Sequence, residues 1–170
     1  MSDHPLAALL RATEGFVLVG DSSEDRFPAL SYAAYTKAGK RFYCVDLGKL
    51  PASRGPVKGG KVYHAASELP ADHADLAVVW MKPRSAARGV EVAHEAGCKR
   101  IWFSFQTGHP EAVAKARSLG MEVVEIGRCP VYYLDDAPLV CRAHVAMVKL
   151  SGTYAKPPQT DPTAKRRELI

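Results

Sequence analysis

The sequence lacks the features that mark several common classes of protein. No apolar run approaches the roughly 20 residues that a membrane-spanning helix needs, so no membrane association is predicted. The four cysteines are widely spaced and contain no C-x-x-C pair, which indicates reduced and often buried thiols. The six histidines show no metal-ligand spacing such as H-x-x-x-H, so no metal site is predicted either.

Sequence motifs typical of particular enzyme classes are missing as well. There is no P-loop, no nucleophile elbow and no Ser-His-Asp order. A dinucleotide fingerprint would read G-x-G-x-x-G, but here Gly20 is followed by no further glycine until Gly39. Without a candidate general base or activated nucleophile, no reaction can be assigned. Whether the protein is an enzyme is left open, and a binding protein is the favoured interpretation.

The net positive charge of the chain is moderate. The net charge is +5, of which +2 belongs to residues 156–170. The remainder is too small and too dispersed for a nucleic-acid-binding surface, although it would suit a small polyanion. The first 15 residues have an acidic start and no cleavage site, so they predict a short helix rather than a signal peptide. A cytoplasmic protein is expected.

Strand-like and helix-like segments alternate along the chain. This alternation with short connections predicts an α/β, Rossmann-like, doubly wound and mainly parallel sheet of five to six strands with helices on both faces. Residues 1–150 would form one domain, and residues 151–170 a flexible basic tail. Strands are predicted at 16–20, 41–47, 75–81, 100–105 and 122–126, a brief extended piece within 61–70, and helices at 28–38, 84–96, 109–119 and 138–150.

The loop after the first predicted strand is the first candidate for a ligand site. In doubly wound folds, ligands bind beyond the carboxyl ends of the strands, near the point where the strand order reverses. The loop reads Gly20-Asp21-Ser22-Ser23-Glu24-Asp25-Arg26. Its amides and hydroxyls could donate to a phosphate, and Arg26 adds a guanidinium. Alternatively, the loop is a polar connection in which Ser and Asp cap the next helix.

Six motifs between about residues 10 and 134 follow one another in an order and spacing that resemble a known family. They are VLVGDSSEDR (17–26), VKGGKVY (57–63), SELP (67–70), DLAVVWMKP (75–83), GCKRIWF (97–103) and GMEVVEIGRCP (120–130). The chain is similar to the small bacterial CoA-binding proteins, which are single-domain relatives of the nucleotide-binding domain in the succinyl-CoA synthetase alpha subunit.

This resemblance implies that CoA lies across the carboxyl edge of the sheet. The loop from Gly20 to Ser23 would hold the pyrophosphate, and Asp46 to Lys49 would flank the adenosine and its 3′-phosphate. Lys82 and Pro83 would line the ends of adjacent strands, and Trp102 to Gln106 would pack against pantetheine. The predicted cofactor-binding residues are Gly20, Asp21, Ser22, Ser23, Arg26, Asp46, Lys49, Lys82, Pro83, Trp102, Ser104, Gln106 and Cys129.

Several of these residues have a second interpretation. Asp46 closes the second strand, where NAD enzymes place the carboxylate that binds ribose hydroxyls, or it caps a loop. Lys82 follows a buried strand and is either a ligand-binding cation or a solvated lysine. Cys129 lies beside Arg128, whose charge would favour a thiolate able to form a mixed disulfide with CoA. A buried cysteine is the alternative. Trp102 belongs either to the core or to the wall of a pocket.

The chain departs from the family pattern at three ligand positions. Asp46-Leu47 stands where the family has Asn or Ser followed by Pro, the run 102–106 replaces W-x-Q-x-G, and Phe27-Pro28 replaces a helix-opening hydroxyl. The favoured function is a carrier, sensor or regulatory module that binds CoA or an acyl-CoA. An NAD(P)-binding oxidoreductase or redox sensor and a Rossmann-like scaffold without ligand are the alternatives. A homodimer is compatible with the sequence.

Overall fold

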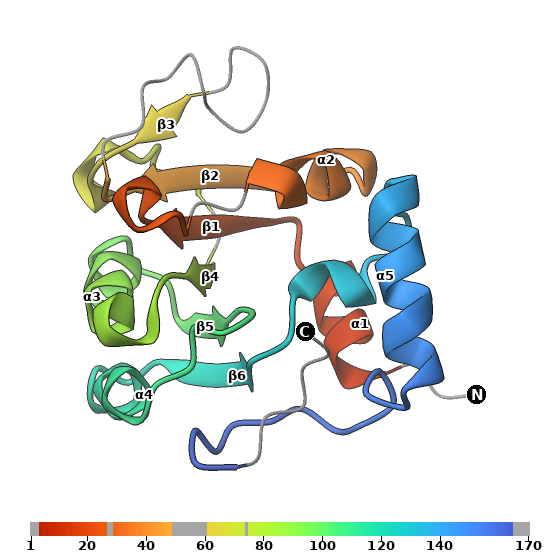
Figure 1. Cartoon of the computed structure of the whole chain (residues 1–170). Helices are drawn as coiled ribbons and strands as arrows, with labels where there is room; N and C mark the ends of the chain where they lie inside the picture. The colour runs from red at the N-terminus through yellow and green to blue at the C-terminus, as the bar shows by residue number, and fades with distance from the viewer. Residues whose placement is uncertain (1–3, 27–28, 49–60, 74, 165–170) are drawn as a thin grey trace.

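The computed structural model describes residues 4–26, 29–48, 61–73 and 75–164, and Figure 1 shows its single sheet. The strand order is β3-β2-β1-β4-β5-β6, and every neighbouring pair is parallel. The order reverses between β1 and β4, which is the switch point of a doubly wound fold. The predicted fold class is thereby confirmed. The strands are β1 (Gly15–Gly20), β2 (Arg41–Asp46), β3 (Val62–Tyr63), β4 (Leu76–Trp80), β5 (Arg100–Phe103) and β6 (Glu122–Ile126).

Strand β1 is buried along its whole length because both faces of the sheet are covered. Successive side chains of a strand point to opposite faces. Accordingly, Val17 and Val19 join one hydrophobic core, while Phe16 and Leu18 join the other. A strand buried on both faces reads as a continuous apolar run, which is why the sequence marks β1 so clearly.

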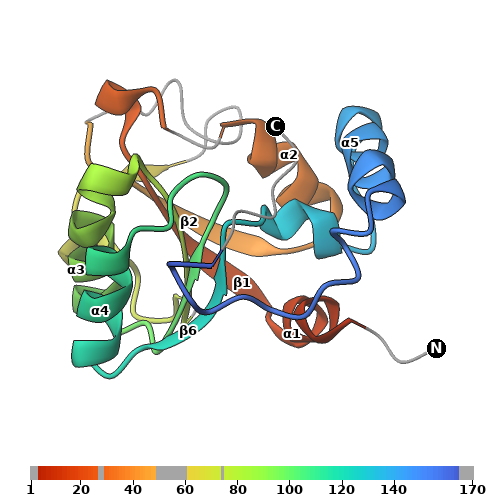
Figure 2. The ribbon, with the colours of Figure 1, turned by 60° about the horizontal axis from the view of Figure 1, so that its bottom comes forward.

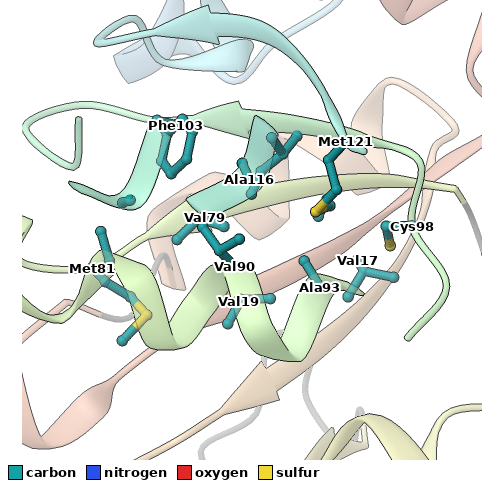
Figure 3. Packing of buried hydrophobic residues seen from close by; sticks show 14 of the residues in the cluster. Val17, Val19, Val79, Met81, Val90, Ala93, Cys98, Phe103, Ala116 and Met121 are labelled. Atoms are coloured by element: carbon teal, nitrogen blue, oxygen red, sulfur yellow. The ribbon is translucent and has the colours of Figure 1, made fainter. Parts of the chain in front are cut away.

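Helices α3 (Ala86–Glu95) and α4 (Pro110–Ser118) cover one face of the sheet (Figure 2). Both lie within the ranges predicted for them. On the predicted apolar stripe of α3, Val90 and Ala93 are fully buried. Figure 3 shows these two residues between the strands and their neighbours in the core. This first face of the sheet is therefore covered mainly by aliphatic side chains.

The opposite face is covered by α1 (Pro5–Ala12), α2 (Ala29–Lys37), the 3-10 helix η5 (Pro130–Tyr133) and α5 (Leu139–Leu150). Aromatic rings fill much of this second core. Trp102 and Tyr133 are among its largest buried side chains. The predicted short N-terminal helix is α1, and its first turn is capped by His4, whose ring accepts a hydrogen bond from the Leu6 N–H at 3.2 Å.

Part of the segment for which the composition predicts a flexible tail contacts the sheet in this structure. Residues 151–164 run along β6, the outer strand of the sheet, where the Ile126 N–H donates to the Gln159 carbonyl at 2.8 Å. The Arg128 side chain, 1% exposed, donates to the carbonyls of Lys156 and Pro157, each at 2.9 Å. A buried guanidinium must satisfy its donors, and this segment provides the acceptors. The basic residues 165–167 lie outside the described part of the chain.

Candidate ligand-binding site

The loop after β1 is a closed turn. Asp21 and Arg26 exchange two backbone hydrogen bonds, of 3.0 and 3.1 Å, which close a loop around the 3-10 helix η1 (Ser22–Glu24). The buried Asp21 carboxylate accepts from the Ser23 N–H at 2.9 Å and from the Ser23 hydroxyl. Asp21 therefore caps η1, as in the capping interpretation of this loop.

Asp46 organises the same turn from the end of β2. Its side chain is fully buried and accepts three hydrogen bonds: from the Ser22 N–H at 2.8 Å, the Ser22 hydroxyl at 2.7 Å and the Gly48 N–H at 3.0 Å. The amides of Ser22 and Ser23, which were predicted phosphate donors, are thus bonded to carboxylates in this structure. Asp46 acts here as a loop-capping group.

The loops after β1 and β2 are pressed together at Gly48. A Cβ atom at this position would overlap with the backbone nitrogen of Ser23 and the hydroxyl of Ser22, so the close approach requires glycine. His64 adds a further link, because its Nδ1 lies 3.0 Å from the Asp46 carbonyl. Lys49, the next predicted ligand residue, lies outside the described part of the chain.

Three cations follow β4, and two of them, Arg84 and Arg88, approach this turn. Lys82 and Pro83 are partly buried where predicted, at the start of the 3-10 helix η4 (Pro83–Ser85). Arg84 Nε is 3.8 Å from a Glu24 carboxylate oxygen, and Arg88 Nη1 is 3.9 Å from an Asp21 carboxylate oxygen. The two arginine side chains are 77% and 62% exposed, so ligand phosphates could reach them. Sequence reasoning missed both, although the K-P-R-S-A-A-R run directly after a strand marks them.

Two buried polar atoms at this edge have no hydrogen-bond partner within the described residues. One is Oε2 of Glu24, whose other oxygen accepts from the Ser85 hydroxyl at 2.5 Å. The other is the indole N–H of Trp80, the last residue of β4, which lies in register with Gly20 of β1. Buried polar groups without partners are rare, and a ligand is one of the few ways to satisfy them.

The loop after β5 meets the first loop across the switch point. Gln106, at a left-handed φ of 53°, accepts a hydrogen bond from Arg26 Nη2 at 2.7 Å. Ser104 is buried and donates its N–H to the Val79 carbonyl at 2.9 Å, so its backbone continues the sheet. Thr107, which sequence reasoning missed, is fully buried and accepts from the Met81 N–H at 3.2 Å. These bonds fix the loops after β4 and β5 relative to each other.

Trp102 lies in the core, which is one of its two interpretations from the sequence. It was predicted to pack against pantetheine, but the side chain is fully buried in the second hydrophobic core. Its indole N–H donates to the Arg128 carbonyl at 2.6 Å, which satisfies the only polar atom of the ring. In the strand RIWF, Ile101 and Phe103 point to the first core and Trp102 to the second, so Trp102 belongs to the packing beneath the site.

Cys129 follows β6, which lies three strands from β1 in the sheet. It is the N-cap residue of η5 and packs, partly buried, against the second core. The neighbouring Arg128 does not offer a spare charge, because its guanidinium bonds the Glu125 carboxylate at 3.0 and 2.5 Å. The arrangement favours the interpretation of Cys129 as a packed thiol over that of an activated one.

Two cavities among the described residues lie elsewhere. One of about 230 Å³ is at the amino edge of the sheet, where its charged lining forms the ion pairs Arg41–Glu14 and Arg100–Asp75. The other, of about 360 Å³, lies between α1, α2 and η5, and its Arg11 is paired with Asp135. Since their charges are already paired and parallel sheets bind ligands at the carboxyl edge, neither is the candidate site.

Within the described ranges, no group of three or more His, Cys, Asp and Glu side chains is placed to hold a metal ion. No helix in this part of the chain combines the length and apolar character needed to cross a bilayer.

Comparison with known proteins relates most of the chain to one family. Residues 15–134 match the family model of the CoA binding domain, and this segment holds all six strands. Similar solved structures include a hypothetical protein from Pyrococcus horikoshii OT3, with 25% identity, a TM-score of 0.63 and coverage of 78% of this chain and 89% of that chain. A conserved hypothetical protein from Pyrococcus furiosus has 26% identity, a TM-score of 0.52 and coverage of 69% and 97%.

A protein from Thermus thermophilus shares the fold at 18% identity, with a TM-score of 0.55 and coverage of 85% of this chain and 99% of that chain. Among curated proteins, none is significantly similar to this sequence. The family match spans well over half of the 170 residues and includes every loop of the candidate site. The chain therefore belongs to the CoA binding domain family.

Proposed function

We propose that this chain binds CoA or an acyl-CoA at the carboxyl edge of its sheet and acts as a carrier, sensor or regulatory module in the cytoplasm. The family match over residues 15–134 is the observation that carries the proposal, because it spans both sides of the switch point. The proposal includes no reaction, and it assigns binding to the loops after β1, β2, β4 and β5.

The charges around the turn support a phosphate-bearing ligand. Lys82 is the N-cap residue of η4, and Arg84 and Arg88 lie in η4 and in the first turn of α3, where the helix dipole also favours an anion. Arginine forks match phosphate oxygens in bidentate geometry. The buried carboxylates of Asp21 and Asp46 are occupied by loop amides and hydroxyls. In this proposal the CoA phosphates are held by the cations on the outer rim.

The unpartnered atoms suit the rest of the CoA molecule. Pantetheine carries amide N–H and carbonyl groups, and adenine carries an amino group. The Trp80 indole N–H can donate to a carbonyl, and Glu24 Oε2 can accept from an N–H or O–H. Both atoms lie beside loops that the switch point brings together, so one extended ligand could satisfy them.

The position of Asp46 supports CoA over NAD(P). A ribose-binding carboxylate must offer its oxygens to the sugar hydroxyls. Both oxygens of Asp46 are engaged by Ser22 and Gly48, and the side chain is fully buried. Removing it should therefore disturb the turn rather than abolish one ribose contact.

Titration calorimetry against CoA, 3′-dephospho-CoA, acetyl-CoA and NADH tests the proposal, after removal of any co-purified ligand. We expect micromolar CoA binding and much weaker NADH binding. Lys82→Ala and Arg26→Ala should each weaken CoA binding about tenfold at low salt, and the difference should shrink as salt rises. Lys99→Ala is the matched control, because this exposed lysine lies at the opposite, amino edge of the sheet.

Each alternative has its own outcome in the same experiment. Tighter binding of NADH than of CoA would replace the proposal with the dinucleotide alternative. No heat from any ligand, with an empty and folded protein, would indicate a scaffold without ligand. If CoA binds but Lys82→Ala and Arg26→Ala behave like Lys99→Ala, the ligand is correct and the assignment of its site is wrong.

A further inference from the structure

Helix α5 lies outside the segment that matches the CoA binding domain, and it is apolar on two opposite sides. One side packs on the second core through Cys141, Val145 and Val148. His144 on this side approaches the Tyr132 hydroxyl at 3.3 Å. Figures 1 and 2 both show α5 at the outer side of the molecule, so its other side faces away from the sheet.

The outer side of α5 exposes large apolar side chains. Leu139 and Leu150 are 79% and 88% exposed, and Val140 and Met147 are 81% and 57% exposed. These four are all the large exposed hydrophobic residues of the described chain, and all belong to this one helix. Single exposed apolar residues are ordinary, but a contiguous cluster marks an interaction surface.

Four residues along the outer side of α5 form an apolar stripe whose spacing is the same from either end of the helix. Leu139, Ala143, Ala146 and Leu150 are spaced by four, three and four residues, so they share one face of the helix. Ala143 and Ala146 are exposed at its centre, where their small side chains would allow close approach of another helix. In an antiparallel pair of α5 helices, Leu139 would face Leu150 of the other copy, and Ala143 would face Ala146.

We propose that a second copy of this chain covers the stripe, and that two α5 helices pack antiparallel about a two-fold axis. An isologous interface must be complementary to itself, and the symmetric stripe meets this condition. Arg142 and Lys149 lie seven residues apart on one flank of the stripe, and Val140 and Met147 lie seven residues apart on the other flank. In the antiparallel pair, Val140 would pack beside Met147 of the other copy, and the cations of the two copies would share the other flank, where Lys149 lies 4.9 Å over the Tyr154 ring of its own chain. The dimer is independent of the proposed CoA site.

Other occupants fit the stripe less well. A helix that binds a membrane surface carries a strongly charged polar face and large apolar or aromatic anchors. Here α5 has only Arg142 and Lys149 as charged residues, alanines occupy the centre of its stripe, and its remaining side is packed on the protein core. An interface centred on one 12-residue helix is small, so we expect a micromolar dissociation constant for the dimer.

Sedimentation equilibrium of the full chain, from about 1 µM to about 1 mM, tests the dimer. Ala143→Glu places a charge at the centre of the stripe and should raise the dissociation constant at least tenfold. Ala114→Glu makes the same change at an exposed position of α4 and should leave it unchanged. Both alanines are exposed and helical, so both variants should fold, which circular dichroism verifies.

A charge exchange tests the register. Leu139→Glu and Leu150→Lys should each weaken the dimer, and the double variant should recover at least part of the loss, because antiparallel pairing brings Glu against Lys. A double variant no better than the single ones would overturn the register. A chain that stays monomeric throughout, or a dimer that Ala143→Glu leaves intact, would overturn the interface. So would a monomer whose stripe instead binds vesicles of phosphatidylglycerol and phosphatidylcholine, with binding lost in Ala143→Glu.

Discussion

The face of the sheet beneath α3 and α4 is packed with aliphatic side chains, whereas the opposite face is built from aromatic rings around a buried ion pair. On the first face, small residues let two helices lie close to the strands (Figure 3). On the second face, Glu125 and Arg128 are 0% and 1% exposed and bonded to each other. The first face is closed within the family segment, while the second needs further parts of the chain.

Tyr133 on the second face contacts segments of the chain that lie outside the family segment. Its ring stacks on His4 with centroids 4.6 Å apart and on Tyr154 with centroids 4.8 Å apart. Its hydroxyl accepts from Arg128 Nη1 at 2.6 Å. His4 precedes the family segment and Tyr154 follows it. The second face therefore depends on polar and aromatic contacts between distant segments, and the first on local apolar packing.

The largest loss of stability should follow from breaking the buried Glu125–Arg128 ion pair. Glu125→Gln keeps the size of the side chain but leaves the Arg128 charge uncompensated in the core, so we expect a loss of about 3–5 kcal/mol in the free energy of unfolding. Because Glu125 also accepts from the Gln159 N–H at 3.0 Å, residues 151–164 should become sensitive to protease.

Urea unfolding and limited proteolysis measure the two consequences. Glu122→Gln on the same strand is the control, since Glu122 is exposed and its replacement should change stability by no more than about 0.5 kcal/mol. If Glu125→Gln is as mild as this control, the ion pair does not hold the second face together.

On the first face we expect a smaller loss of stability, from a Gly→Ala substitution of the kind that stabilises most helices. In most helices, Gly→Ala stabilises by about 1 kcal/mol. At Gly89 of α3, a Cβ would lie 2.7 Å from Val79 Cγ1 and 2.9 Å from Met81 Sδ. Val79 is stiff and lies in the centre of the sheet, so α3 would have to move outward. Gly89→Ala should therefore destabilise by about 1–3 kcal/mol.

The comparison for this variant is Ala114→Gly on the exposed side of α4, where propensity alone acts and the loss should be about 1 kcal/mol. Urea unfolding of both variants gives the values. Stabilisation by Gly89→Ala would mean that a Cβ atom fits between α3 and the strands, and that the first face is not tightly packed.

The two faces also differ in how far the sequence reveals them. Strand β1 and helices α3 and α4 follow from apolar runs and from the glycines that end each helix, because these signals are local. Gly97 and Gly120 have φ values of +80° and +75°, as helix ends at glycine require. The contacts of residues 151–164 with the sheet could not be predicted, because they depend on acceptors for Arg128 that lie 25 to 29 residues further along the chain.

The candidate site was predictable in position but not in its internal bonds. The parallel sheet places the loops of β1, β2, β4 and β5 at one edge, so Arg26, Asp46 and Gln106 could be grouped from the sequence. Which carboxylate caps which loop depends on contacts across 24 residues, as between Ser22 and Asp46. For Trp102, the run RIWFSF is apolar on both sides, and only the structure shows that it points to the second core.

The smallest effect is expected from Cys98, a buried thiol of the first core. Burial, and secondarily the negative charge of Asp75, raises the pKa of Cys98 from 9.0 to about 12. The unfolded chain therefore loses this proton first as pH rises. The stability that Cys98 contributes is complete below pH 9 and is lost as pH rises toward 12. At about pH 10 the loss should be on the order of 1 kcal/mol.

Cys98→Ala separates the effect of Cys98 ionisation on stability from that of buried tyrosines, whose ionisation also destabilises the fold at high pH. The variant leaves a small cavity and is less stable than the parent at neutral pH, but its stability should fall less steeply between about pH 9 and about pH 11. Urea unfolding of both proteins across this range gives the two slopes. Equal slopes would show that the Cys98 thiol ionises as readily in the folded state as in the unfolded one, and hence that the first face admits water at the end of α3.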